Sequence, residues 1–233
     1  SEFEILCGVK SFKEPIIEFN YIKNQLDCLP NLLRGMGYST YSTNANRPWM
    51  YNASKAYKSI GFDKQLWPVT FSKKLFSDIP GGYLYDRSLL DYNIKMSTEF
   101  EGPYFNYIVG AHGHIPYKRN KKKRPDVYSS ENIDLENLMN ISFYREQIIL
   151  DFFKKHSDNE ISIICGDHQP HIRKMDYFGS DKFFTYCISN NKNFNIVNLF
   201  DIPLFILNTL TGDEKWSDQT KISHLEEYQN LLH

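Results

Sequence analysis

"ISIICGDHQPHI", residues 161–172, is the stretch that decides the fold. Apolar residues typical of a buried strand end at Gly166, which lets the chain turn directly into Asp167 and His168. A second apolar run, "YFNYIVG" from Tyr104, leads in the same way into "AHGHIPY". Because ligands of open α/β sheets bind beyond the carboxyl ends of the strands, this pattern predicts an α/β fold with a site at the strand ends.

The composition predicts one globular domain without a global charge preference. The chain has 233 residues, of which 41% are hydrophobic and 15% aromatic, so a sizeable core is expected. Lys and Arg number 27 against 28 Asp and Glu, which gives a formal charge of −1 and no overall attraction to nucleic acid or anionic membranes. No apolar run is long enough to span a membrane, and no signal peptide is recognisable. The chain begins without Met, so we expect residues 1–233 to be one domain of a longer protein.

Short β-branched or aromatic runs alternate with longer segments of helical period, which is typical of a sheet flanked by helices. We expect strands in "FEILCG" from Phe3, "YSTYST" from Tyr38, "YFNYIVG" from Tyr104, "ISIICG" from Ile161 and "FFTYCIS" from Phe183. We expect helices at residues 30–35, 52–60, 87–100, 131–156 and 200–210. An apolar stripe on the fourth helix is expected to be core, and it comprises Leu135, Leu138, Met139, Ile149, Phe152 and Phe153.

The four cysteines, Cys7, Cys28, Cys165 and Cys187, have neither zinc-site spacing nor the density of a disulfide scaffold. Cys165 lies in an apolar run where any small hydrophobic residue would serve. The cysteines therefore predict neither a pairing nor a compartment.

The residue types at the two strand ends allow more than one chemistry. Asp167 and His168 are adjacent and can both reach one divalent cation, at about 2.0 to 2.2 Å for oxygen and nitrogen ligands. The alternative is that Asp167 caps a turn and His168 is a surface residue. His112 and His114 could bind metal, donate to an anionic oxygen or transfer protons, and the alternative is packing within the loop.

The ordered set of motifs resembles the sulfatase-like branch of the alkaline phosphatase superfamily, in particular the lipoteichoic acid synthases and phosphoglycerol or phosphoethanolamine transferases. "GAHGHIPY" resembles that family's Ser-His-Gly-Pro-Tyr segment, and "IICGDHQP" its Gly-Asp-His segment. Similar stretches follow the family order: "SEFEILCG", "LPNLLRGMGYST", "MYNASKAYKSIGFDK", "YDRSLLD" and "NLFDIPLFILNTLTG". The resemblance implies an alkaline phosphatase-like central sheet flanked by helices and truncated at its N-terminus.

The resemblance also assigns expected roles. Asp167 and His168 match the family's metal ligands, and the ion expected is manganese or zinc, with magnesium as an alternative. His114 matches the histidine that contacts the substrate phosphate, with His112 as second choice. The remaining substrate-binding positions are at Tyr51, Asn52 and Arg47: Tyr51 replaces the family's Trp, Asn52 matches its Asn, and Arg47 lies close enough to substitute for the Arg that Ala53 replaces. His171 is a further candidate for the site.

The family mechanism is double displacement through a covalent phospho-enzyme. The resemblance implies a metal-dependent transferase of the cell envelope, on the extracytoplasmic face of the membrane, which moves a phosphoglycerol- or phosphoethanolamine-type group from a lipid donor to a glycan or lipid acceptor. Its Thr or Ser nucleophile lies a few residues before the segment matched by Ser1, so we expect this chain alone to be inactive and its parent to be membrane-anchored. The alternatives are a sulfuric ester or phosphodiester hydrolase of the same fold, and a non-catalytic binding module.

A basic run, "YKRNKKKRP" at residues 117–125, directly follows "HIPY". It could attract an anionic phospholipid or a glycan phosphate or sulfate ester. The alternative is a flexible solvated loop. Nucleic acid is not expected, because no stacking aromatic residues are interleaved among the charges.

Overall fold

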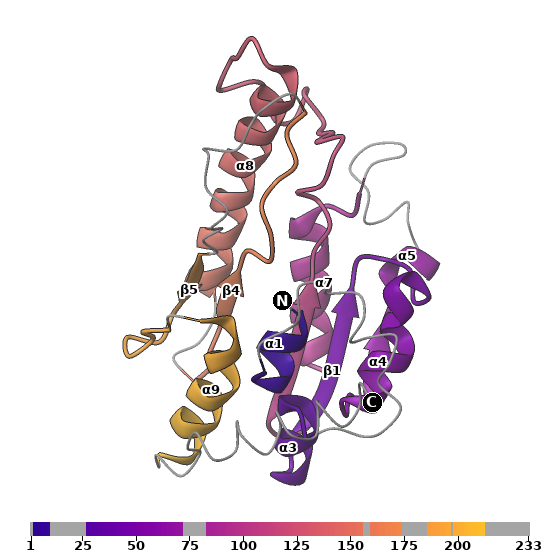
Figure 1. Cartoon of the computed structure of the whole chain (residues 1–233), viewed down its shortest axis with the longest axis vertical. Coiled ribbons are helices and arrows are strands. Elements are labelled where there is room, and N and C mark those ends of the chain that lie inside the picture. Colours follow the sequence, from indigo (N-terminus) through magenta and orange to yellow (C-terminus); the bar gives the residue numbers. More distant parts are fainter. Residues whose placement is uncertain are drawn as a thin grey trace.

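The strands form two separate sheets in the computed structural model, which describes residues 2–9, 27–71, 83–155, 159–173, 186–196 and 198–212 (Figure 1). β1 (Ser39–Asn44) lies between β2 (Lys64–Leu66) and β3 (Tyr104–Val109), and both neighbours are parallel to it. β4 (Ile163–Cys165) pairs with β5 (Cys187–Ser189) in antiparallel orientation. The α/β class is confirmed, but β3 and β4, which lead into the predicted site, belong to different sheets.

Helices were predicted well in the described part of the chain. The helices are α1 (Glu2–Cys7), α3 (Leu29–Gly35), α4 (Ala53–Ser59), α5 (Pro68–Phe71), α7 (Asp86–Ser97), α8 (Ile133–Lys155) and α9 (Ile202–Thr211). Short 3-10 turns precede α4 at Met50–Asn52 and α9 at Leu199–Asp201. All five predicted helices are confirmed, whereas the short β2 and α5 were not predicted.

β1 is buried on both faces, as expected for the middle strand of a parallel sheet. One face packs against a cluster that includes α1 and Tyr57 of α4, and Asn44 donates to the Tyr57 hydroxyl at 2.9 Å. On the other face, α7 places Asn93 against the strand, where Thr43 donates to its side-chain oxygen at 2.6 Å. These hydrogen bonds offset part of the cost of burying the polar side chains of β1.

The prediction of a strand at "FEILCG" is wrong, because this segment forms α1. The buried residues Phe3, Leu6 and Cys7 are spaced by three and four positions, so they share one face of a helix. Glu2 and Glu4 lie in the first turn, where negative charge favours a helix. A short apolar run has no period long enough to separate the two possibilities.

The apolar stripe predicted as core on α8 is only partly buried. Met139 is 36% exposed, and the residues of α8 that are buried are Asp134, Asn140, Ile141 and Ile148. The two polar members bind other segments: Asn140 accepts from the backbone N–H groups of Val127 and Tyr128. The face of α8 that is buried therefore includes polar residues and does not coincide with the apolar stripe. The strand predicted from Phe183 is confirmed only as β5, and residues 183–185 lie outside the described part.

All four cysteines form disulfides, Cys7–Cys28 and Cys165–Cys187, which the sequence did not predict. Cys165 and Cys187 are directly opposite each other in the β4–β5 pair. Cys7 and Cys28 are both buried and join α1 to the start of α3. Each bond closes a loop of about the same length, with sequence separations of 21 and 22.

Removing either disulfide is expected to lower the free energy of unfolding by about 3 kcal/mol. The reason is that a disulfide closing a loop of this length restricts the unfolded chain, and without it the unfolded chain gains conformational entropy. The measurement is urea unfolding of Cys7→Ala/Cys28→Ala and of Cys165→Ala/Cys187→Ala beside the native chain. A native chain whose unfolding midpoint is unaffected by reductant would contradict the pairing.

Candidate functional site

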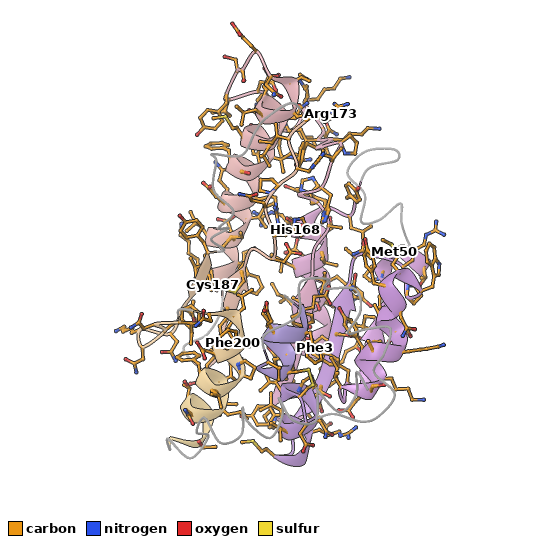
Figure 2. The ribbon with its side chains drawn as sticks, viewed as in Figure 1. Phe3, Met50, His168, Arg173, Cys187 and Phe200 are labelled. Atoms are coloured by element: carbon orange, nitrogen blue, oxygen red, sulfur yellow. A yellow bond between two sulfur atoms is a disulfide. The ribbon has the colours of Figure 1, made fainter. Side chains whose placement is uncertain are left out.

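The structure brings together the two histidines expected to share a site. The histidine loop, residues 110–114, follows β3, and Asp167 and His168 follow β4. The Nε2 atoms of His114 and His168 are 3.3 Å apart, and Nε2 of His168 lies 3.6 Å from a carboxylate oxygen of Asp167. His168 lies near the centre of the molecule in Figure 2, and its side chain is 55% exposed. The expected closeness of His114 and His168 is therefore confirmed.

The hydrogen bonds of both rings indicate which nitrogen carries the proton. Nδ1 of His114 lies 3.2 Å from the carbonyl oxygen of Ala111, and Nδ1 of His168 lies 2.8 Å from that of Gln169. A carbonyl oxygen only accepts, so each Nδ1 is the N–H donor in the neutral ring. Both Nε2 atoms then carry lone pairs that face one another. Both atoms are therefore available to a cation bound at this point.

Asp167 and His168 fit a divalent cation as an incomplete ligand pair. An imidazole whose Nδ1–H donates to a carbonyl presents Nε2 in the orientation and tautomer that metal ligands use. Within the ranges that the structure describes, no group of three or more His, Cys, Asp or Glu side chains could hold a metal ion. Further ligands would have to come from elsewhere.

Tyr117 connects the two segments of the site. Its hydroxyl donates to the carbonyl oxygen of His171 at 2.5 Å, and its backbone N–H donates to the carbonyl oxygen of His114 at 3.0 Å. Tyr117 is 1% exposed and follows the cis peptide bond between Ile115 and Pro116. The spacing of the two histidine-bearing segments therefore depends on a buried phenol. His171 itself is exposed, and no described contact joins its imidazole to His168.

Asp134 of α8 holds the other end of the Asp167 segment. The guanidinium of Arg173 donates to both carboxylate oxygens of Asp134, at 2.6 and 2.8 Å, and its backbone N–H donates at 3.2 Å. This two-pronged contact lowers the pKa of Asp134 to about 2. The segment from Asp167 to Arg173 is thus tied to α8.

The contribution of Asp134 to stability is expected to depend on pH. Its folded pKa of about 2 lies below the ordinary value, so the contribution is fully present above about pH 4 and is lost as the pH falls through about 2. The measurement is denaturant unfolding of the native chain and of Asp134→Asn between pH 7 and pH 2.5. The stability difference between them is expected to narrow below pH 4, and a difference that stays constant would contradict this account.

His112, the second-choice substrate contact, is buried. It is 4% exposed, and its ring meets Tyr85 edge-on with ring centroids 5.3 Å apart. Burial lowers the pKa of His112, while Asp86 raises it and Arg145 lowers it further. The ring of His112 therefore stays neutral near pH 7 and is shielded from solvent.

The remaining predicted substrate-binding residues lie after β1. Tyr51 and Asn52 have φ values of 51° and 57°, a left-handed conformation that is uncommon for Tyr but tolerated by Asn. Tyr51 is 56% exposed, and the guanidinium of Arg47 lies 5.9 Å from the ring of Trp49. No described hydrogen bond or ion pair joins Arg47 or Tyr51 to His114 or His168. The roles of these three residues stay predictions.

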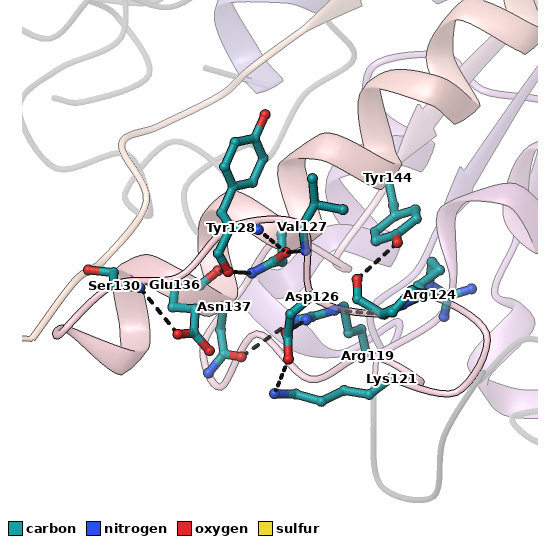
Figure 3. Close-up of polar contacts among 12 residues, drawn as sticks. Arg119, Lys121, Arg124, Asp126, Val127, Tyr128, Ser130, Glu136, Asn137 and Tyr144 are labelled. Atoms are coloured by element: carbon teal, nitrogen blue, oxygen red, sulfur yellow. Dashed lines mark hydrogen bonds and ion pairs between the residues drawn. The ribbon is translucent and has the colours of Figure 1, made fainter.

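The basic run is folded, which differs from the flexible-loop alternative (Figure 3). Arg119 and Arg124 are 6% and 7% exposed. Arg119 pairs with Asp126 and donates to the carbonyl oxygen of Arg124 at 3.1 Å. Lys121 pairs with the same carboxylate at 3.1 Å, and Tyr144 donates to the carbonyl oxygen of Pro125. Half of the run's charge therefore serves the structure of this loop.

A cleft of about 460 Å³ lies between α7, α8 and the end of the basic run. Its two arginines are engaged by neighbours: Arg87 pairs with Asp151 at 2.6 Å, and Arg124 lies 4.2 Å from the ring of Tyr85. Because both arginines are paired with groups of the protein, we assign no ligand to this cleft.

The first residue of α1 lies close to the site. Tyr57 donates to the carboxylate of Glu2 at 2.6 Å, and burial is the main cause that raises the pKa of Glu2. The charge of Asp167 raises this pKa further. Figure 2 labels both Phe3 of α1 and His168.

Sequence reasoning did not find Glu2, Tyr117, Asp134 or Arg173. The quoted "HIPY" contained a signal for Tyr117, because a buried tyrosine usually needs a hydrogen-bond partner. Asp134 and Arg173 are 39 positions apart, so no local pattern joins them.

A family model described as Sulfatase matches residues 1–230. The chain is also 25% identical over 190 residues to the "Putative cyclic beta-1,2-glucan modification protein" of Rhizobium meliloti (strain 1021). This match covers 75% of the chain and 29% of the relative, so the chain spans less than a third of that protein.

Three solved structures share the fold. The lipoteichoic acid synthase LtaP from Listeria monocytogenes has a TM-score of 0.74 at 17% identity, over 94% of this chain and 62% of that one. A Vibrio parahaemolyticus protein in the alkaline phosphatase superfamily has a TM-score of 0.71 at 18% identity, over 89% and 53%. The Streptococcus pyogenes phosphoglycerol transferase GacH, in complex with sn-glycerol-1-phosphate, has a TM-score of 0.64 at 16% identity, over 99% and 70%. The alkaline phosphatase-like fold is therefore confirmed.

Proposed function

Because the chain belongs to the sulfatase family, we propose that it is part of a metal-dependent enzyme that transfers a phosphate-containing group between hydroxyl groups in the cell envelope. The observation that carries this proposal is the meeting of His114, His168 and Asp167 beyond the ends of β3 and β4. Two imidazoles that present lone pairs beside a carboxylate suit a site for a cation and an anionic ester.

Asp167 and His168 would hold the divalent ion, for which manganese or zinc is the natural choice and magnesium the alternative. When bound, the ion would supply neutralisation of the charge on the ester oxygens and activation of a hydroxyl nucleophile. His114, once protonated at Nε2, would donate to the transferred group or to the leaving oxygen. Tyr117 and Asp134 would keep the two segments at the distance this requires.

We further propose that the nucleophile is a Thr or Ser of the parent protein, shortly before Ser1. The support is the resemblance, which places the nucleophile before the segment matched by Ser1, together with the pKa of Glu2 at the start of α1, which is raised by burial and also by the charge of Asp167. Attack by this hydroxyl on phosphorus would break the bond to the donor oxygen. A second hydroxyl, from a glycan or lipid, would then take the group from the enzyme.

Several observations support a location in the cell envelope. The two disulfides are stable in oxidising compartments. The Rhizobium meliloti relative is described as a glucan modification protein, which supports a glycan acceptor. None of the described helices is both long and apolar enough to cross a membrane. Anchoring of the parent protein in the membrane is a proposal that rests on the family resemblance.

The test is turnover by the full-length parent with and without Mn²⁺, on a chromogenic phosphodiester and a chromogenic sulfate ester, and on phosphatidylglycerol vesicles with a glucan acceptor. We expect metal-dependent reaction of the phosphorus esters and transfer to the glucan. Faster reaction of the sulfate ester would instead favour a sulfuric ester hydrolase, which the Sulfatase family match makes the second candidate. No turnover of any substrate would favour a binding module.

A further inference from the structure

We infer that Asp86 and Arg145 form an ion pair that positions the histidine loop, so that both are positioning residues for His114. The consequence for the reaction rests on the proposed function. The positional effect itself does not, because it concerns only where the loop and its rings lie.

The ion pair joins two helices directly behind the histidine loop. Asp86 is the first residue of α7, and Arg145 projects from the middle of α8. Nε of Arg145 donates to Oδ2 of Asp86 at 2.6 Å, and the carboxylate is 14% exposed. A second ion pair, between Arg87 and Asp151, joins the same two helices at the same distance of 2.6 Å. The pair of Asp86 and Arg145 is therefore not the sole ion pair that joins α7 to α8 among the described residues.

Only the first pair touches the histidine loop, and it does so at both glycines. A Cβ atom on Gly110 would lie 3.1 Å from Oδ1 of Asp86, and a Cβ atom on Gly113 would collide with Nη1 of Arg145. Neither glycine has a positive φ, so space rather than backbone conformation requires glycine here. Each member of the ion pair thus lies against one end of the loop and fills the space that a side chain there would need.

Between the two glycines lie the groups that orient the imidazoles. The carbonyl oxygen of Ala111 accepts from Nδ1 of His114, so the position of this carbonyl sets the ring and its tautomer. Burial lowers the pKa of the His112 ring, the charge of Asp86 raises it and that of Arg145 lowers it. The same ring packs on Tyr85, the residue before Asp86. A shift of the ion pair would therefore move Ala111 and, through it, Nε2 of His114.

The arrangement is not one that maximises stability. Oδ1 of Asp86 and Nδ1 of His112 are buried and have no hydrogen-bond partner among the described residues. Leaving a buried polar atom without a partner costs free energy, and an ion pair in such surroundings is weak grounds for stability. A requirement for the loop's position explains why these groups are nevertheless present.

The experiment uses the ring ¹⁵N signals of the histidine-labelled chain in NMR spectra. The native chain is expected to show His114 in the single tautomer with the proton on Nδ1. Arg145→Met removes the pair, and Gly113→Ala displaces the guanidinium without changing either member of the pair. Each variant is expected to shift the signals of His112 and His114 and to abolish the single-tautomer pattern of His114. The double variant is expected to add little, because both changes act on one contact.

The matched control is Arg87→Met, which breaks the other ion pair between α7 and α8. It is expected to change the melting temperature about as much as Arg145→Met and to leave the signals of His114 unchanged. Equal shifts of the His114 signals in Arg87→Met and Arg145→Met would overturn the inference, as would unchanged signals in Gly113→Ala. Should Arg145→Met fail to fold, Gly113→Ala decides the question, since its added methyl meets only the end of a flexible side chain.

These readouts need no turnover, so the inference and the proposed function can fail separately. A parent protein that is inactive on every ester, with loop signals that respond as described, would overturn the function alone. An active parent whose His114 signals ignore Gly113→Ala would overturn the positioning role alone.

Discussion

Asp167→Ala is expected to lower kcat/KM of the full-length parent toward a phosphorus ester by about 1000-fold or more. The reason is that Asp167 is one of the two residues, with His168, that we propose as metal ligands. Loss of a metal's electrostatic stabilisation of the transition state removes several kcal/mol, which corresponds to a factor of this size. The measurement is steady-state kinetics at saturating Mn²⁺, with Zn²⁺ and Mg²⁺ in parallel.

Asp91→Ala is the matched control, because Asp91 is an exposed carboxylate on α7. It is expected to keep kcat/KM within about twofold, as for most substitutions of exposed residues outside the site. A similar loss in both variants would mean that stability, and not the metal, accounts for the effect. Retention of most activity in Asp167→Ala would contradict the assignment of Asp167.

His114→Gln is expected to lower kcat by about 100- to 1000-fold with a smaller change in KM, as when one donor to a developing anionic oxygen is removed. Its Nε2 faces the site while its Nδ1 is occupied by Ala111, so the ring can serve the ester through Nε2 alone. The measurement separates kcat from KM across pH, because a role in proton donation would also remove one limb of the pH profile.

The combined variant tests whether His114 and Asp167 act together. Residues of one catalytic unit are not additive, so His114→Gln is expected to cost little more in the Asp167→Ala background. Full additivity of the two losses would indicate that the residues serve different steps or sites.

The sequence predicted the site's centre because strand ends are local patterns. Gly166, Asp167 and His168 follow an apolar run, and so does the histidine loop, which was enough to expect His114 near His168. The sequence could not show that β3 and β4 would lie in different sheets, since pairing depends on contacts between distant segments. The same limit applies to the Tyr117 hydroxyl, whose partner lies 54 positions away.

Errors in the sequence prediction have particular physical causes. α1 was taken for a strand because a six-residue run shows too little periodicity. The core face of α8 was misplaced because Asp134 and Asn140 are buried to bind other segments, and apolar spacing cannot reveal this. The disulfides were missed because pairing follows the β4–β5 register and the contact between α1 and α3.

The most direct test of the central claim is anomalous scattering from crystals of the full-length parent soaked in Mn²⁺. The account predicts a peak at about 2.0 to 2.2 Å from a carboxylate oxygen of Asp167 and Nε2 of His168, with His114 facing it. A metal peak bound elsewhere, or no peak beside Asp167 and His168 in crystals of an active enzyme, would contradict the account.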